Sequence, residues 1–312
     1  MTAPPASPHA AAAREPQTFA GPSRLARYAS LVKLPHTVFA LPFALVGVVL
    51  ASYRHAVTAG QVAWVVVAFT AARFAAMAFN RIVDRDVDAA NPRTAVREIP
   101  SGLVGVREAQ LATFAAGAVF VGAAWALNPV CGWLAPVALL WVLGYSYAKR
   151  VTRWSHLVLG LGLGIAPVGG YLAVAGRWSE PWWLLCALSL AVMTWVAGFD
   201  IFYALQDEQF DRAHGLRSVP AALGQRRAIA VARGLHLGTV ALLAAVAATV
   251  PGGAPAALAW AGVVVAAALL AYEHRLVRPG DLSRLDAAFF TMNGVISLAF
   301  FACVLAGRVL AR

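Results

Sequence analysis

Nine apolar stretches, each about as long as a membrane-spanning helix, constrain this chain more than any other feature of its sequence. A helix needs roughly 20 mostly apolar residues to cross the hydrocarbon core of a bilayer. Charged residues make up 12% of the chain, whereas soluble domains carry about 25%. The sequence therefore predicts an all-α, polytopic membrane protein with about nine transmembrane helices around a central cavity. We predict these helices at residues 34–53, 61–82, 107–127, 131–148, 155–174, 181–205, 228–249, 254–272 and 286–309.

The connectors between these stretches are too short to form a soluble domain with its own core. We therefore expect residues 25–312 to form a single transmembrane domain. Residues 1–24 are rich in Ala and Pro and lack the apolar segment of a signal peptide. We expect them to be a disordered N-terminal tail.

The net charge of +11 could suggest a nucleic-acid partner, but the distribution of the basic residues gives a different explanation. If the N-terminus is cytoplasmic, 20 of the 25 basic residues fall on the cytoplasmic side and one, Arg73, falls within a span. Such asymmetry is typical of membrane proteins, whose cytoplasmic loops carry the excess of Lys and Arg. We expect a bacterial-type inner (plasma) membrane, a cytoplasmic N-terminus and no nucleic-acid partner. The four basic residues on the other side are Arg54, Arg177, Arg308 and Arg312.

Half of the 14 acidic residues lie in two short segments, at the cytoplasmic ends of the second and sixth predicted helices. The first segment is NRIVDRDVD, residues 80–88. Asn80, Asp84 and Asp88 follow one another at intervals of four residues, which predicts that they share one helix face. Asp86 is expected to point away, toward solvent.

The second acidic segment, DIFYALQDEQFD at residues 200–211, has a similar spacing. Asp200, Tyr203, Asp207 and Asp211 occur at i, i+3, i+7 and i+11, again on one predicted helix face. The two helices would thus present oxygen atoms at similar depths. Asp200 and Tyr203 would lie one to two turns deeper in the membrane than the other two residues.

Carboxylates at the C-terminal end of a helix oppose its dipole and repel one another, so this arrangement needs a cation. One alternative is a solvated helix end whose charges are neutralised by neighbouring Arg81, Arg85 and Arg212. The other is a metal ion. Oxygen ligands without His or Cys favour Mg²⁺, which commonly completes its coordination with substrate phosphates. We therefore expect a Mg²⁺ site with a diphosphate as its partner.

Basic residues on the same side support an anionic ligand. Lys149 and Arg150 end the fourth predicted helix in YSYAKR, and Arg73 precedes Asn80 by seven residues on the same helix face. Arginine within a membrane span is costly and usually functional, although a structural ion pair is an alternative. Lys33 lies just before the first predicted span. The alternative to an anion-binding role is a side chain that extends along the helix and places its ammonium group at the membrane surface.

With both acidic segments in view, the chain resembles the UbiA superfamily of intramembrane prenyltransferases over residues 25–310. The first segment matches that family's Asn-x-x-x-Asp-x-x-x-Asp motif, and the second matches its Asp-x-x-Tyr-Ala-x-x-Asp-x-x-x-Asp motif. YSYAKR resembles the end of the family's fourth helix. The resemblance implies Mg²⁺-dependent transfer of a prenyl group from an allylic polyprenyl diphosphate to an acceptor that is usually aromatic.

The resemblance also implies roles for individual residues. Tyr203 would steady a carbocation through its ring face, and Asp200 would orient the acceptor or assist proton loss. Arg97 and Arg93 would clamp the entrance to the site, unless they are solvated loop charges. The residues implied to bind Mg²⁺ and diphosphate are Asn80, Asp84, Asp88, Asp207 and Asp211, and those implied to meet the phosphates are Arg73, Lys149, Arg150, Lys33 and Arg97.

Residues 31–47 and 211–224 resemble a 4-hydroxybenzoate polyprenyltransferase-like branch of the family, which includes enzymes of a menaquinone (futalosine) route. The resemblance implies 4-hydroxybenzoate or 1,4-dihydroxy-6-naphthoate as the acceptor, in ubiquinone or menaquinone biosynthesis. Lys33 or Arg73 would hold the acceptor carboxylate. His36 would contact its phenol or simply end a helix.

Other functions remain open at this stage. The acceptor of such a prenyltransferase could be a haem, a chlorophyll or a lipid headgroup. A divalent-cation transporter is a non-enzymatic alternative, but its ligands would lie near the bilayer midplane, without phosphate-binding cations beside them.

Two further features of the sequence are expected to be structural. His55, His156, His236 and His274 show no spacing that suggests a partner. The glycine-rich segment GLGLGIAPVGG, residues 160–170, lies inside a predicted span. We expect its glycines to allow close helix packing or to leave room for a lipid chain.

Overall fold

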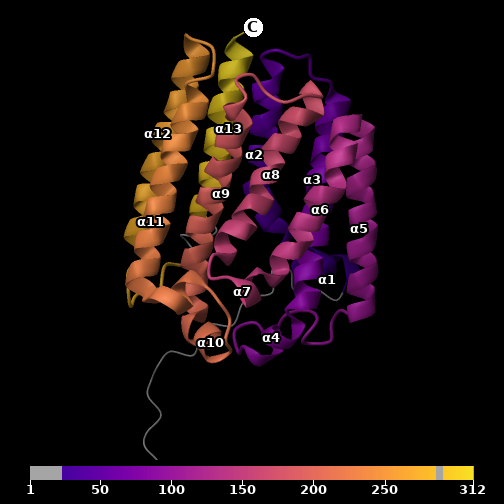
Figure 1. Ribbon diagram of the computed structural model, residues 1–312, viewed down its shortest axis with the longest axis vertical. Coiled ribbons are helices and arrows are strands. Elements are labelled where there is room, and N and C mark those ends of the chain that lie inside the picture. Colours follow the sequence, from indigo (N-terminus) through magenta and orange to yellow (C-terminus); the bar gives the residue numbers. More distant parts are fainter. Residues whose placement is uncertain (1–22, 286–290, 312) are drawn as a thin grey trace, which may run out of the picture.

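The computed structural model describes residues 23–285 and 291–311, and this part of the chain is a bundle of helices without a β-strand (Figure 1). The predicted all-α class is therefore confirmed. Two short 3₁₀ helices span Tyr145–Tyr147 and Leu205–Asp207. The α-helices are α1 (Arg24–Leu31), α2 (Leu34–Ser52), α3 (Ala59–Val83), α4 (Arg85–Ala90), α5 (Val106–Leu127), α6 (Pro129–Gly144), α7 (Ala148–Val151), α8 (Ser155–Ala175), α9 (Trp183–Ala204), α10 (Glu208–Ala213), α11 (Val219–Ala247), α12 (Ala254–Leu276) and α13 (Asn293–Leu310).

Within the described residues, eight helical segments are long and apolar enough to cross a membrane. The first predicted span corresponds to α2, whose apolar part is Ala40–Ser52, so the predicted number of about nine is approximately right. Of the predicted tail, residues 1–22 lie outside the described residues. The tail cannot extend to residue 24, because α1 begins at Arg24 after a Ser23 cap. The predicted span at 286–309 also begins outside the described residues.

The start of the seventh predicted span was wrong by nine residues. α11 begins at Val219, well before the predicted residue 228. The Ser218 hydroxyl accepts a hydrogen bond from the Ala221 amide at 3.3 Å and so caps the helix. Arg226 and Arg227 are polar enough to end an apolar pattern, yet they lie within the same helix beyond a kink at Gly224. Hydropathy identified the membrane-embedded part of α11, whereas the Ser218 cap determines where the helix begins.

The predicted uninterrupted helix face also needs correction at both acidic segments. α3 ends at Val83, and Asp84 joins it to α4 with ψ near 3°. α9 ends at Ala204 and is followed by the 3₁₀ turn that contains Asp207. Clustered carboxylates at a helix C-terminus repel one another and oppose the helix dipole, which disfavours a straight continuation of the helix. Beyond the two breaks, Asp88 and Asp207 contact basic side chains.

The glycine-rich segment packs as predicted. A Cβ atom at Gly160 or Gly164 of α8 would lie 2.3 Å or 2.6 Å from a carbonyl oxygen of α9. At Gly170 it would lie 2.0 Å from the Ala44 carbonyl oxygen of α2. Since real Cβ atoms cannot approach so closely, these glycines are required for α8 to pack against both neighbours.

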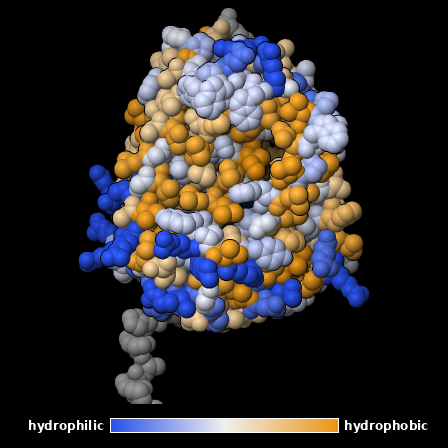
Figure 2. All heavy atoms as spheres, viewed as in Figure 1, coloured by the Kyte–Doolittle hydropathy of each residue, from blue (hydrophilic) through white to orange (hydrophobic). Residues whose placement is uncertain are grey.

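The short helices α4, α7 and α10 gather at one end of the bundle, and the C-terminus lies at the opposite end (Figure 1). Hydrophobic side chains cover the middle of the bundle in the same view, whereas hydrophilic ones concentrate at the end with α4 and α10 (Figure 2). The two acidic segments therefore meet at one polar end of an apolar bundle.

Candidate active site

A cavity of about 240 Å³ lies where the ends of α3, α4, α9 and α10 meet α7 and α8. Of the twelve residues expected to bind the metal or diphosphate or to act in catalysis, eleven line it and Arg150 does not, while Arg93, expected at the entrance, lines it as well. The two acidic segments are more than 100 residues apart in sequence, so their meeting is a property of the fold. The eleven residues are Lys33, Arg73, Asn80, Asp84, Asp88, Arg97, Lys149, Asp200, Tyr203, Asp207 and Asp211.

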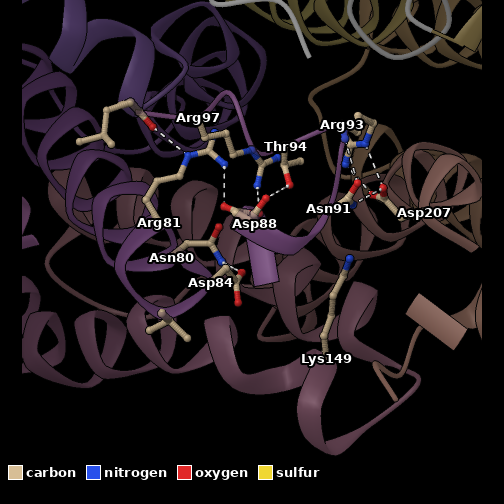
Figure 3. Close-up of polar contacts among 12 residues, drawn as sticks. Asn80, Arg81, Asp84, Asp88, Asn91, Arg93, Thr94, Arg97, Lys149 and Asp207 are labelled. Atoms are coloured by element: carbon tan, nitrogen blue, oxygen red, sulfur yellow. Dashed lines mark hydrogen bonds and ion pairs between the residues drawn. The ribbon is translucent and has the colours of Figure 1, made fainter. Parts of the chain in front are cut away.

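The carboxylates of the first acidic segment are held by cations (Figure 3). Asn80 donates a hydrogen bond from Nδ2 to Asp84 at 2.8 Å, and Arg150 forms an ion pair with Asp84 at 3.0 Å. Asp88 is buried and accepts a hydrogen bond of 2.7 Å from Arg97. Arg81, also buried, lies 4.0 Å from the other Asp88 oxygen.

Arg150 occupies a position behind Asp84. Its guanidinium also donates to the carbonyl oxygens of Val83 and Ser146, at 2.9 Å and 3.1 Å. It thereby satisfies a backbone group at the C-terminal end of α3 and neutralises the carboxylate next to it. Its contact with a phosphate stays a prediction.

In the second acidic segment, Asp207 is bound by the loop that follows α4. Arg93 binds both of its carboxylate oxygens, and Asn91 donates from Nδ2 at 3.0 Å. Asp211 is buried, with the Lys149 ammonium 3.8 Å away. Figure 3 shows Lys149 extending toward the Asn91–Asp207 pair from the other side of the site.

The proposed neutralisation by sequence neighbours is only partly present. Arg81 lies near Asp88, but Arg85 pairs with Asp86 at 3.4 Å and Arg212 pairs with Glu208 at 2.9 Å. Asp86 is exposed as predicted, with 82% of its side chain accessible. The buried carboxylates are neutralised mainly by distant residues, which a solvated helix end would not require.

Two buried carboxylate oxygens fit a divalent cation. Within the described residues, Asp88 Oδ2 and Asp211 Oδ2 have no hydrogen-bond partner. A buried acceptor left without a partner is costly unless a ligand satisfies it. No three His, Cys, Asp or Glu side chains of the described chain converge on a single point that could hold a metal. Carboxylate oxygens of this kind are the ligands of hard cations such as Mg²⁺, which takes only part of its coordination from protein carboxylates.

Burial and charge also perturb groups at the edge of the site. Burial raises the pKa of Asp84, the nearby Asp88 carboxylate raises it further, and Arg150 and Lys149 counteract both effects. Burial lowers the pKa of Lys33 well below its usual value, as does repulsion from Arg81 and other arginines. Since an anion in the cavity would relieve that repulsion, this side of the site is suited to bind one.

The ring of Tyr203 lies between two cations. The Arg93 guanidinium carbon is 5.1 Å from the ring centroid and Lys33 Nζ is 5.6 Å from it. Arg93 also donates to the Tyr203 hydroxyl at 3.0 Å. The ring thus accommodates positive charge in this structure, as cation–π interactions allow.

A second, apolar chamber of about 200 Å³ adjoins the polar cavity. Arg73, Met77, Tyr145, Leu159 and Leu163 line both spaces. The Arg73 Nε atom is buried and has no hydrogen-bond partner among the described residues. Arg73 forms no ion pair within that part of the chain, so the structural ion pair considered for it is not observed there.

The sequence analysis missed several contributors to the site. Asn91 and Thr94 follow the first motif and line the cavity, and their position shortly after Asp88 was the available signal. His156 was expected to be structural because its spacing suggests no partner, yet its ring bonds to Asp200 at 2.6 Å. His236 and His274 also pair with each other, at 3.1 Å. Sequence spacing could not reveal pairs whose members are 44 and 38 residues apart.

Comparisons with known proteins agree with this architecture. The model of the UbiA prenyltransferase family matches residues 40–302. A 4-hydroxybenzoate octaprenyltransferase of Aromatoleum aromaticum is 31% identical over 235 residues, which cover 75% of this chain and 77% of that protein. The apo structure of a UbiA homolog from Aeropyrum pernix K1 superimposes with a TM-score of 0.75 and 33% identity, over 88% of this chain and 98% of that one.

A UbiA homolog from Archaeoglobus fulgidus, solved with GPP and Mg²⁺, has the same fold. It superimposes with a TM-score of 0.67 and 21% identity, and the alignment covers 91% of this chain and 99% of that one.

A polar cavity walled by two acidic helix ends inside an apolar helical bundle defines an intramembrane enzyme of prenyl transfer. The chain belongs to the UbiA prenyltransferase family. It is accordingly an integral membrane protein and a prenyl-transferring enzyme, and the transporter alternative is set aside.

Proposed function

We propose that the protein transfers a polyprenyl group from an allylic polyprenyl diphosphate to an aromatic hydroxy-carboxylate, with Mg²⁺ as cofactor, in respiratory quinone biosynthesis. The observation that carries this proposal is the polar cavity, which brings both acidic motifs and their cations together beside an apolar chamber. The homolog bound to GPP and Mg²⁺ supports the donor and the metal. The relatives named 4-hydroxybenzoate octaprenyltransferase support the acceptor class, with 4-hydroxybenzoate first and 1,4-dihydroxy-6-naphthoate second.

The metal and diphosphate would be held by the two acidic motifs. Asp88 and Asp211 offer buried oxygens that accept no hydrogen bond and have only long ion pairs with Arg81 and Lys149, and Asp84, Asp207 and Asn80 lie around the same cavity. When bound, Mg²⁺ supplies positive charge that stabilises the departing diphosphate.

Cations of the chain would bind the phosphates from several sides of the cavity. Lys149 approaches from α7, Arg97 and Lys33 from the side of α4 and α1, and Arg73 from α3. Each places positive charge where negative charge develops as the allylic C–O bond breaks and its electron pair leaves with the diphosphate. Arg150 would act on Asp84, which it already contacts.

The prenyl chain would occupy the apolar chamber. Its walls come from α2, α3, α5, α6 and α8, and Gly162 and Gly169 of the glycine-rich segment take part in them. This lining supports the expectation that the glycines leave room for a lipid chain. Because apolar walls exclude water, they would also protect an allylic carbocation from hydrolysis.

The acceptor would react beside Asp200 and Tyr203. These residues lie about 10 Å and 6 Å above Asp207 along the helical segment, at 1.5 Å per residue. Tyr203 would steady the carbocation with a ring that already accommodates cations. Asp200 would orient the acceptor hydroxyl or accept the ring proton that is lost when the new C–C bond forms. Lys33 or Arg73 would bind the acceptor carboxylate, whereas the side chain of His36 lies outside the described residues.

We further propose that residues 25–312 act as one transmembrane unit, with the polar end of the bundle and the N-terminus in the cytoplasm. The positive-inside pattern of the basic residues supports this orientation.

The decisive experiment is an assay of the purified protein with Mg²⁺ and a long-chain allylic diphosphate. 4-Hydroxybenzoate and 1,4-dihydroxy-6-naphthoate are offered in parallel. A prenylated product from one acceptor, lost in Asp84→Ala or with a chelator, supports the proposal and selects the pathway. Mg²⁺-dependent diphosphate binding without product from either would instead favour a haem, chlorophyll or lipid-headgroup acceptor.

A further inference from the structure

A buried histidine, His156, contacts one oxygen of the Asp200 carboxylate. His156, the second residue of α8, is 1% exposed, and its Nδ1 atom lies 2.6 Å from Asp200 Oδ2. Asp200 retains 21% exposure of its side chain and lines the polar cavity. Asp200 therefore faces the polar cavity, whereas His156 is enclosed by protein.

The surroundings of His156 determine which ring nitrogen carries the proton. The Val219 backbone N–H donates to His156 Nε2 at 3.3 Å. A nitrogen that accepts a hydrogen bond carries no proton, so in this arrangement the proton is on Nδ1. Nδ1–H then donates to Asp200, and this tautomer is the one that leaves the carboxylate an acceptor.

The backbone that fixes this tautomer is itself firmly held. Val219 is the first residue of α11 and is fully buried. The residue before it, Ser218, caps the helix. One residue earlier, the Arg217 amide donates to the Lys149 carbonyl oxygen at 2.7 Å. The start of α11 is thus attached to α7, which carries Lys149 into the cavity.

We propose that His156 is a positioning residue for the transfer reaction, because it holds Asp200 Oδ2 and leaves Oδ1 as the oxygen that meets the acceptor. The inference rests on the proposed role of Asp200 at the acceptor. A carboxylate without this hydrogen bond can rotate and pair with the Lys149 and Arg73 cations that line the same cavity. Such pairing would remove it from the acceptor.

Two substitutions separate the two hydrogen bonds of the ring. In His156→Asn the side-chain amide can occupy the place of Nδ1 and still donate to Asp200, but it gives up the bond from Val219. In His156→Gln the side chain reaches the place of Nε2 and can still accept from Val219, but it gives up the donor to Asp200. A third variant, His156→Phe, keeps a planar ring in the same space and gives up both hydrogen bonds.

The experiment measures kcat and KM for the aromatic acceptor, the Kd of an unreactive allylic diphosphate analogue with Mg²⁺, and the thermal midpoint of the purified full chain. We expect kcat to fall about 10- to 100-fold in His156→Gln. His156→Asn should retain most of the wild-type kcat, and His156→Phe should lose at least as much as His156→Gln. The Kd of the diphosphate analogue should be unchanged in all three.

A double substitution tests whether His156 acts through Asp200. In an Asp200→Asn background, His156→Gln should cause no further loss of kcat, because the group that it orients is already gone. A further loss there would overturn the inference. So would equal kcat values for His156→Asn and His156→Gln, or losses that follow the thermal midpoint or diphosphate affinity. If His156→Gln does not fold, an unchanged kcat in His156→Phe would also overturn it.

The same measurements distinguish failure of this inference from failure of the proposed function. Wild-type protein that binds the diphosphate but prenylates no aromatic acceptor overturns both the proposed function and the role of His156. An active wild type whose histidine variants are equally active overturns the role of His156 alone.

Discussion

The polar cavity and the apolar chamber share a wall but are held together in different ways. The cavity is built from ion pairs between distant segments, such as Arg93 with Asp207 and Lys149 with Asp211. The chamber is bounded by small and aliphatic side chains and by helices in close backbone contact. Charged contacts depend on individual atoms, whereas apolar walls depend on shape and volume. We therefore expect substitutions in the cavity to act on every donor and those in the chamber to discriminate donors by chain length.

The largest expected effect is on stability, and it tests how far the cavity depends on its ion pairs. Arg93→Gln leaves the buried Asp207 carboxylate without its main partner, which should lower the free energy of unfolding by about 3–5 kcal/mol. Thermal unfolding in detergent would measure it. Arg85→Gln is the control, because its partner Asp86 is exposed and the change should stay within about 0.5 kcal/mol. Equal shifts for both variants would show that the cavity is not held by this pair.

The next effect, on catalysis, should be independent of donor length. Asp84→Ala is expected to reduce kcat/KM by about 100- to 1,000-fold, because it removes a carboxylate proposed to hold the metal. The matched control is Asp86→Ala, only two residues away but exposed. Initial rates with a five-carbon and a long-chain allylic diphosphate, with and without a chelator, give the measurement. A loss confined to long donors would contradict the division between cavity and chamber.

Arg73 lines both the polar cavity and the apolar chamber. Its replacement tests which of the two spaces depends on it. Arg73→Met removes a charged donor proposed to bind the diphosphate, so kcat/KM should fall about 10- to 100-fold for all chain lengths. Initial rates with a short and a long donor would measure the fall, and isothermal titration with diphosphate analogues of two lengths would measure the change in affinity. If only the longer analogue bound more weakly, Arg73 would act as part of the chamber.

The smallest effect should be selective for donor length. A Cβ atom at Gly162 would make only ordinary contacts, the nearest being Trp141 and Val142 side chains at 3.7 Å. Gly162→Leu would therefore fill chamber volume, and we expect about a 10-fold loss of kcat/KM with the long donor and little loss with the short one. Gly122→Leu, on an exposed position of α5, is the control. Equal losses for both donors would indicate that the prenyl chain of the donor does not occupy this chamber.

The sequence predicted the class of fold and most of the cavity because both depend on local patterns. Twenty-residue apolar runs predicted the spans, and intervals of three and four residues placed the carboxylates on common sides of their helices. The local motif alone was enough to predict that Asn80, Asp84 and Asp207 line the cavity, without knowledge of the rest of the chain. The pattern was less reliable for helix ends, since the break at Asp84 and the early start of α11 depend on capping and charge rather than hydropathy.

Contacts between distant segments could not be predicted from the pattern. Arg93 and Asp207 are separated by 114 positions, and His156 and Asp200 by 44. A buried histidine has the same sequence signature whether it fills space or orients a carboxylate. The loop after α4 was expected to clamp the entrance with Arg93 and Arg97 or to be solvated, but its spacing gave no sign that these guanidinium groups bind Asp207 and Asp88.

The pairing of each buried carboxylate with a basic side chain implies that ligand binding is an exchange of counterions. Mg²⁺ that approaches Asp88 or Asp207 competes with Arg97 or Arg93, whose guanidinium groups must then find another anion. The proposed diphosphate would provide that anion. Metal alone should therefore bind weakly and diphosphate alone should bind weakly, while together each strengthens the other by the same factor. The enzyme would thus admit its metal with its substrate and keep little of it between turnovers.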